Sequence, residues 1–349
     1  MEYYWKKKKV VSFACALLVT LIHLKVSPYY PALQSSAVGK AIGWIEDFFQ
    51  NGIGAVAVPL FFVMSGATLF CNYSDDKYLA KLKSRFHSLV VPYLLWNTLI
   101  VIAHMVLDYS PLASSFAAED TIELSCLPIL RAILFYDRLK GFWFVYNLIF
   151  FVILTPLFSF ALKNKMTAAL FSVFLLVLPL FGTDAMAFFH LSARSPFYYF
   201  TGCVIGKYFF DFFRSRNRSR SGLGIVGCVV CTIVLLCDWN GVLSLHEAAR
   251  QLIIVCFAIS FWVAFDILAK AGEFPDKGYM QYNFFLFAAH PFVQTALLKL
   301  CARVLPATGF TEAFVYLFTG VFTVVICVLA ASAVKKTAPG LYRAMSGGR

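Results

Sequence analysis

The chain alternates long apolar stretches with short polar connections from one end to the other. A helix needs about 20 residues to cross the hydrocarbon core of a bilayer. On that measure ten stretches are predicted to be transmembrane helices. They lie near residues 10–27, 52–71, 88–107, 142–162, 166–183, 194–211, 222–239, 248–269, 280–301 and 312–334. The pattern therefore predicts an all-α, polytopic integral membrane protein, with residues 1–349 forming one transmembrane domain and no separate soluble domain.

Composition supports a membrane protein and argues against a soluble one. Sixty per cent of the 349 residues are hydrophobic, 14% are charged and the mean hydropathy is +0.76, whereas soluble domains are about a quarter charged. The net charge of +12 would suit nucleic acid. Its cations, however, sit in short clusters between apolar stretches, as the positive-inside rule describes, so no nucleic-acid partner is expected. Most cysteines lie in or beside apolar stretches, and we interpret them as small buried side chains rather than as metal ligands.

The lysines and arginines also predict an orientation. With the N-terminus inside, 21 of the 30 fall on the inner side and nine on the outer side, so both termini are expected in the cytoplasm. The longest connection, residues 108–141, then lies outside and is either a mobile lid or a structured substrate contact. The most basic inner loop, residues 211–221, is either an anchor that fixes the orientation or a binding surface for anionic lipid head groups.

Two histidines fall within the predicted spans. His23 lies late in the first span, which follows Lys6–Lys9, and His290 precedes Pro291 in the ninth. An ionisable side chain in a membrane span is costly, so it marks a functional candidate that faces other helices or a wet cavity. An imidazole exchanges a proton near neutral pH, which suits a general base or a transient acyl carrier. The alternative is a packing histidine, or one that simply lies near the outer interface.

Four further patterns follow in order. They are VPLFFVMSG at 58–66, KLKSRFHSLVVPYLLWN at 81–97, FWFVYNL at 142–148 and NFFLFAAHP at 283–291. Together with a histidine late in the first span, they resemble the acyltransferase family 3 membrane proteins over nearly the whole chain. The resemblance implies a multi-pass enzyme of the bacterial inner membrane. Such an enzyme transfers an acyl group, often acetyl, from cytoplasmic acyl-CoA to a sugar hydroxyl of a glycan or glycolipid at the outer face. Acyl-CoA is then a co-substrate, membrane lipids surround the protein, and no bound cofactor or metal is expected.

The donor is expected near the inner ends of the second and third spans. Lys81, Lys83 and Arg85 form a cationic cluster that suits the phosphates of coenzyme A, although ordinary positive-inside charge explains them as well. Ser65 and Gly66 are small enough to let a thin acyl-pantetheine arm approach. A close helix contact is the alternative for this pair.

The catalytic residue is expected to be His23, interpreted as the general base on the acceptor hydroxyl. Trp143 and Asn147, four residues apart, share one helix face and are predicted to line the same cavity as Asn97 and His290. An oxyanion forms when a thioester is attacked, and Asn147 or Trp143 is expected to donate to it. Interface anchoring explains Trp143 equally well.

Two positions depart from the family pattern. The family often carries an arginine eleven residues before the first-span histidine, where this chain has Ser12. It often has another after the Trp-Phe-aliphatic run, where this chain has Tyr146. Lys9, about one helical turn inward from Ser12, is the nearest replacement for the first cation, because a lysine can extend its ammonium along a helix.

Two other classes of function remain open at this stage. A transporter or flippase of a glycolipid or small solute would use His23, His290, His104 and Asp266 as polar groups along a path. It predicts substrate movement without covalent change, whereas an acyltransferase produces a new ester. A scaffold without activity is the third possibility, suggested by the two missing arginines. We expect the acyltransferase.

Overall fold

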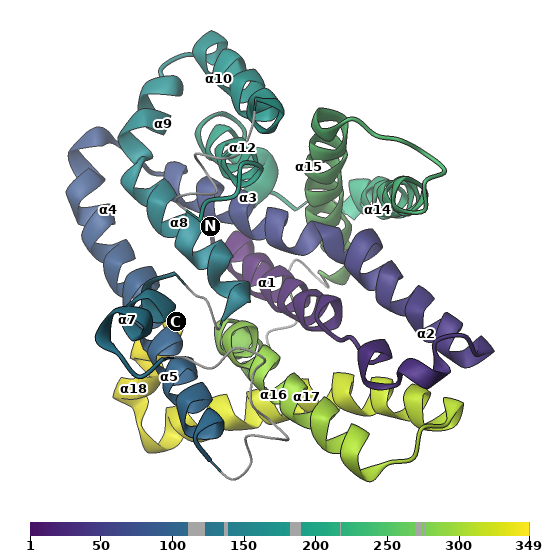
Figure 1. Cartoon of the computed structure of the whole chain (residues 1–349). Coiled ribbons are helices and arrows are strands. Elements are labelled where there is room, and N and C mark those ends of the chain that lie inside the picture. Colours follow the sequence, from purple (N-terminus) through teal and green to yellow (C-terminus); the bar gives the residue numbers. More distant parts are fainter. Residues whose placement is uncertain are drawn as a thin grey trace. The chain divides into compact units, whose positions relative to one another are not determined.

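The computed structural model describes residues 1–110, 123–135, 139–181, 190–216, 218–269, 274 and 277–348. All regular structure in these residues is helical and none of them forms a strand, which confirms the all-α prediction (Figure 1). Seven helical stretches among them are long and apolar enough to cross a membrane: Glu2–Tyr29, Ala37–Phe70, Asp75–Asp108, Arg218–Trp239, Glu247–Leu268, Gly278–Val304 and Gly309–Thr337.

The other three predicted spans also contain helices, but these are shorter or bent. The fourth span holds α8 (Trp143–Ile153) and α9 (Thr155–Ala161), which meet at 64°. The fifth holds α10 (Lys165–Val177) and the sixth α12 (Ser195–Tyr208). Ten membrane crossings and the cytoplasmic position of both termini stay predictions.

Pro156 explains the bend in the fourth span. A proline has no backbone N–H, so it leaves the carbonyl four residues earlier without its helical partner. That carbonyl belongs to Val152, and it accepts a hydrogen bond of 2.7 Å from the Thr155 hydroxyl instead. The side chain next to the proline therefore satisfies the backbone group that the bend exposes.

The chain divides into two compact units. Unit 1 consists of residues 1–19, 47–83 and 150–281, and unit 2 of residues 20–46, 84–149 and 282–349. The division falls inside α1 (Glu2–Ile22), so the last residues of this helix belong to unit 2 together with His23.

In unit 1, α3 (Ala57–Phe70) packs against α12, and α14 (Arg218–Trp239) packs against α15 (Glu247–Ala264). The first pair approaches closely because glycines lie at the contact. A Cβ on Gly66 would overlap the Tyr199 carbonyl oxygen, and one on Gly202 would overlap that of Val63. Small residues at such contacts are a general feature of helix packing in membranes.

The first helix begins earlier than its apolar pattern predicts. It starts at Glu2 and includes the four lysines, whereas the first span was predicted from residue 10. Lys7 is only 1% exposed, and its ammonium lies 2.5 Å from a carboxylate oxygen of Asp266 and 4.5 Å from the ring centre of Trp262. Tyr3 donates to the same carboxylate oxygen at 2.6 Å. A distant carboxylate in unit 1 therefore allows a lysine to be buried in the helix.

In unit 2, α16 (Asn283–Val304) packs against α17 (Gly309–Thr337), and α5 (Val91–Asp108) packs against α7 (Cys126–Leu134) and α18 (Pro339–Ser346). The indole N–H of Trp96 donates to the Met345 carbonyl oxygen at 3.0 Å, which fixes the end of α18 to α5. The shorter helix α2 (Ala37–Asp47) also belongs largely to this unit.

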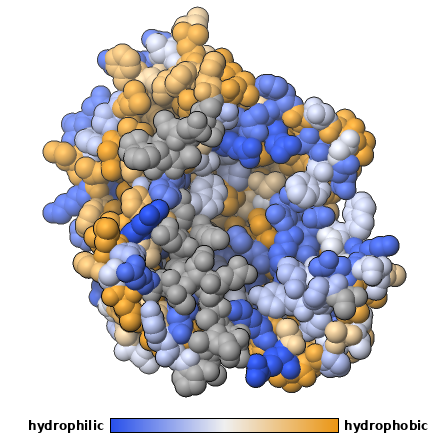
Figure 2. All heavy atoms as spheres, viewed as in Figure 1, coloured by the Kyte–Doolittle hydropathy of each residue, from blue (hydrophilic) through white to orange (hydrophobic). Residues whose placement is uncertain are grey.

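Apolar side chains cover parts of the outer surface. On α9 and α10 they include Phe160, Met166, Leu170, Val173 and Phe174, each more than half exposed (Figure 2). Continuous exposed apolar surface of this kind is expected where helices face lipid.

All ten cysteines are free thiols, and five of them are buried. The prediction of small buried side chains is correct for Cys15, Cys203, Cys231, Cys301 and Cys327, whereas it is wrong for Cys256, which is exposed on α15. Cys126, at the start of α7, is the second exposed thiol.

Candidate functional site

The two predicted histidines lie together in unit 2. His290 is fully buried on α16, whereas His23 is exposed in the turn that follows the last residue of α1. Nε2 of His290 lies 3.4 Å from Nδ1 of His23, and the ring centres are 5.3 Å apart. The sequence predicted each histidine singly, 267 positions apart, and gave no indication of their pairing.

With both rings neutral, the contacts of His290 indicate which of its nitrogens carries the proton. Its Nδ1 lies 2.8 Å from the Phe287 carbonyl oxygen and 3.2 Å from that of Leu286. A carbonyl oxygen can only accept, so Nδ1 of His290 is the protonated nitrogen and its Nε2 carries the lone pair. That lone pair faces His23, so Nδ1 of His23 is the donor across the pair. Nε2 of His23 is then the basic nitrogen of the neutral ring.

Aromatic contacts join the pair to the start of α8, the helix that carries Trp143 and Asn147. Phe287, three residues before His290, contacts the His290 ring at 6.3 Å and stacks on Phe142 at 5.8 Å. Phe144 meets the edge of Phe287 at 5.9 Å. In the sequence, Trp143 lies between these two phenylalanines. The start of α8 therefore packs against Phe287, which is one helical turn before His290 on α16.

The predicted amide residues lie on α8 and α5. Asn147 is fully buried on α8, and its side-chain N–H donates to the Trp143 carbonyl oxygen at 2.7 Å. Asn97, 1% exposed on α5, donates in the same way to Tyr93 at 2.8 Å. Trp143 and Asn147 are thus one turn apart on α8, and their lining of a shared cavity with Asn97 and His290 stays a prediction. In both amides one N–H serves the backbone four residues earlier, which fixes the direction of the side chain.

Two further polar side chains contact the backbone around His23. Gln294, four residues after His290 on α16, donates to the Thr20 carbonyl oxygen at 3.1 Å. Glu46, 4% exposed on α2, accepts from the amide of Val26. Gln294 could have been found from the sequence, because positions 290 and 294 share a helix face. No pattern in the sequence indicates the role of Glu46.

The predicted donor residues are spread over the two units. Lys81, Lys83 and Arg85 lie on α4 (Tyr78–Arg85), where Lys83 is exposed and the other two are half-buried. Ser65 and Gly66 lie on α3 in unit 1, where Gly66 forms the close contact with α12. Of the two interpretations given for Gly66, the helix contact is the one that its surroundings show. The binding of a donor by these five residues stays a prediction.

Unit 1 also contains two cavities that share Lys207. One, of about 290 Å³, is lined in part by Asn72, Lys207 and Arg214, and the other, of about 260 Å³, by Tyr73 and Ser159. Arg214, on α13 (Phe210–Arg214), forms an ion pair of 2.7 Å with Asp211. The basic loop predicted at 211–221 therefore contributes a cation to a cavity wall.

The connection at 108–141, predicted to face outward, lies partly outside the described residues. Its acidic Glu119 and Asp120 and its charged Asp137 and Arg138 fall there. The two positions that depart from the family pattern are described: Ser12 is 8% exposed on α1, and Tyr146 contacts the rings of Tyr93 and Phe135.

The helices and the histidine pair define a polytopic α-helical membrane protein with a site suited to proton transfer beside the end of its first helix. A family model described as an acyltransferase domain, Acyl_transf_3, matches residues 13–332. The chain therefore belongs to acyltransferase family 3 and is a multi-pass membrane acyltransferase. No curated protein and no solved structure matches it.

Proposed function

We propose that the protein transfers an acyl group, most simply acetyl, from acyl-CoA to a hydroxyl of an exported or cell-surface glycan or glycolipid. The observation that carries the proposal is the 3.4 Å contact between His23 and His290 in a chain of this family. The contact orients an exposed imidazole with its basic nitrogen defined.

His23 acts as the general base in this proposal. Its Nε2 takes the proton of the acceptor hydroxyl while the hydroxyl oxygen attacks the thioester carbonyl. The C–S bond then breaks, and the imidazolium returns the proton to the leaving thiolate, so the products are an ester and free CoA thiol. His290 accepts from Nδ1 of His23 throughout, which holds the ring orientation and stabilises the imidazolium. The role of base is proposed here in preference to that of an acyl carrier, which would use the same Nε2 lone pair.

The donor would bind from the cytoplasm and the acceptor would approach from outside, with the protein in a bacterial inner membrane. Arg85, Lys81 and Lys83 supply cations that suit the phosphates of CoA. Lys207 and Arg214 at the cavities of unit 1 are further cations on the side that the charge distribution predicts to be cytoplasmic. Asn147 or Trp143 is proposed to donate to the thioester oxyanion.

The test is mass spectrometry of surface glycans and glycolipids from cells that lack the gene and carry either the wild type or a variant. Wild type should add the mass of one acyl group, and His23→Ala should abolish that addition at equal protein level. His246→Ala is the matched control, because His246 is an exposed histidine at the start of α15 in unit 1, and it should behave as wild type.

Two results would overturn the proposal. Full acylation with His23→Ala would remove the base assignment. An unchanged acyl content, together with accumulation of an intact glycolipid on the inner face, would favour a transporter instead.

A further inference from the structure

His23 lies just beyond the end of the helix that precedes it. Helix α1 ends at Ile22, and His23 is exposed in the following turn. A general base must keep its nitrogen within hydrogen-bond reach of the reacting hydroxyl. An error of about 1 Å in such a position can cost about 100-fold in rate. Contacts from outside α1 to the backbone on either side of His23 therefore bear on the position of its ring.

Glu46 holds the backbone directly after His23. One oxygen of its carboxylate accepts from the amides of Val26 at 2.7 Å and Ser27 at 3.2 Å. The other oxygen accepts from the Ser27 hydroxyl at 3.1 Å and lies 3.9 Å from the ammonium of Lys25. Because the carboxylate is 4% exposed, water competes little for these bonds, and bonds to a charged acceptor are roughly twice as strong as neutral ones.

Gln294 holds the backbone directly before His23. Its amide donates to the Thr20 carbonyl oxygen, three residues before the histidine, and Val26 lies three residues after it. Gln294 is on the same helix as His290, one turn further along. The element that supplies the partner imidazole therefore also fixes the approach of the chain to His23.

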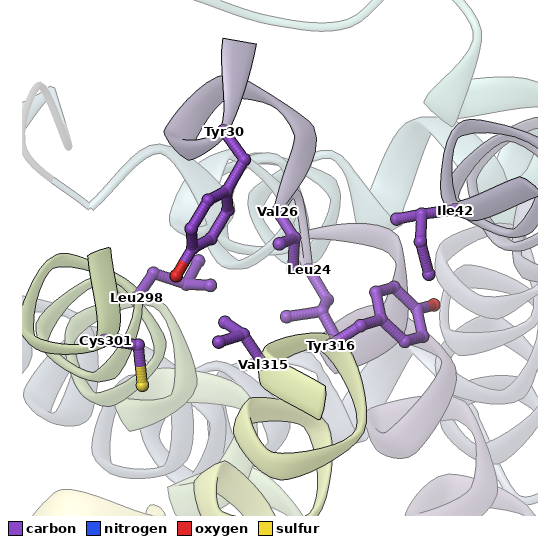
Figure 3. Close-up of a cluster of buried hydrophobic side chains, with 8 residues drawn as sticks. All are labelled: Leu24, Val26, Tyr30, Ile42, Leu298, Cys301, Val315 and Tyr316. Carbon is purple, nitrogen blue, oxygen red and sulfur yellow. The ribbon is translucent and has the colours of Figure 1, made fainter. Parts of the chain in front are cut away.

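Apolar packing reinforces both contacts. Leu24 and Val26 are fully buried, and they point into a cluster with Leu298 of α16 and Val315 and Tyr316 of α17 (Figure 3). Their two side chains flank Lys25 in the chain. Residues 24–26 are thus anchored by side chains and by backbone amides at once, while His23 itself stays exposed.

We propose that Glu46 is a positioning residue for His23, with Gln294 as its counterpart on the other side. Neither residue touches a substrate in this proposal. Together they hold residues 20–27 so that Nδ1 of His23 meets His290 and Nε2 is presented to the acceptor. The inference rests on the proposed role of His23 as base.

The test uses intact membranes that contain the full-length protein, with radiolabelled acetyl-CoA as donor and the membranes' own glycolipids as acceptor. We expect Glu46→Ala to lower kcat about 10- to 100-fold, as the loss of hydrogen bonds to a charged group predicts, with KM for acetyl-CoA unchanged. Glu46→Gln keeps one accepting oxygen and should restore part of the rate. Gln294→Leu should lower kcat in the same way.

Glu312→Ala is the matched control. Glu312 is fully buried in the first turn of α17, and among the described residues its carboxylate oxygens have no hydrogen-bond partner. It therefore shares the residue type, burial and unit of Glu46 and is close enough to interact with its charge, but it makes none of the hydrogen bonds that Glu46 makes to residues 26 and 27. Its rate should stay near that of wild type.

The outcomes separate this inference from the proposed function. If His23→Ala is inactive while Glu46→Ala, Glu46→Gln and Gln294→Leu match Glu312→Ala, the positioning role is wrong and the base assignment stands. If Glu46→Ala raises KM for acetyl-CoA instead of lowering kcat, Glu46 acts on the donor and the inference is also wrong. If His23→Ala keeps the wild-type rate, the base assignment fails although acyl transfer stands, and the inference fails with the base assignment. Should Glu46→Ala not accumulate in the membrane, Glu46→Gln and Gln294→Leu decide the matter.

Discussion

The buried ion pair between Lys7 and Asp266 should be among the most sensitive points in unit 1. The two side chains are 1% and 3% exposed, and their charged atoms are 2.5 Å apart. We consider the change Asp266→Leu, which removes the carboxylate and leaves the Lys7 ammonium buried. Breaking one side of a buried pair costs about 3–5 kcal/mol, because the remaining charge has no compensation.

One other contact bears on this magnitude. Tyr3 also loses its acceptor, which adds about 1 kcal/mol. The contact of Lys7 with Trp262 is present in both proteins and does not enter the difference. The expected net loss in the free energy of unfolding is therefore about 4–6 kcal/mol.

The double variant Lys7→Met/Asp266→Leu tests the cause. Replacing a whole buried pair by apolar side chains is often neutral, so this variant should be more stable than Asp266→Leu alone. Glu2→Ala is the matched control, because the exposed Glu2–Lys6 pair at 2.9 Å lies on the same helix and should contribute little to stability.

The assay is thermal unfolding of purified protein in lipid nanodiscs, followed by the fraction that remains monodisperse on size exclusion. The reasoning is refuted if Asp266→Leu unfolds at the same temperature as Glu2→Ala, or if the double variant is less stable than Asp266→Leu. A confirmed result also bears on the transporter alternative. Asp266 was a candidate polar group along a solute path, and a carboxylate held by Lys7 and Tyr3 is poorly suited to that role.

Two further predictions concern single positions. His290→Leu removes the acceptor for Nδ1 of His23, so kcat in the acetyl-CoA assay should fall about 10-fold, which corresponds to the loss of one hydrogen bond. His290→Asn should lower kcat less. Equal decreases in kcat for the two variants would show that the hydrogen-bond acceptor is not the cause. Gly66→Ala places a methyl group on the Tyr199 carbonyl and should cost about 1–3 kcal/mol in unfolding free energy. Gly222→Ala on α14, where a Cβ has open space, should not lower stability, and an equal loss at both glycines would contradict the packing argument.

The length of the apolar stretches was sufficient to predict the fold class and a helix in every predicted span, because apolar length is a local property of the chain. It failed at the start of α1. Four consecutive lysines indicate the end of a membrane span, and only Asp266, 259 positions away, makes the burial of Lys7 possible. Such a pairing depends on tertiary contacts that no local pattern contains.

The candidate site shows the same distinction. His290 was identified because an ionisable residue inside an apolar helix is conspicuous, and it is indeed buried. His23 was expected within a helix but lies in the turn after it, since α1 begins and ends earlier than its apolar stretch. Glu46 was missed because an acidic residue in an outer connection is unremarkable. Its importance comes from backbone amides twenty positions earlier.

The two exposed thiols make the native chain suitable for site-directed labelling. Cys126 belongs to unit 2, in the connection predicted to face outward, and Cys256 belongs to unit 1 on an apolar helix. A water-soluble maleimide and a lipid-soluble one should therefore prefer different thiols, since the other eight are buried or half-buried. Replacing one exposed cysteine leaves a single reporter in a chosen unit, so spectroscopic probes can be introduced without first building a cysteine-free protein.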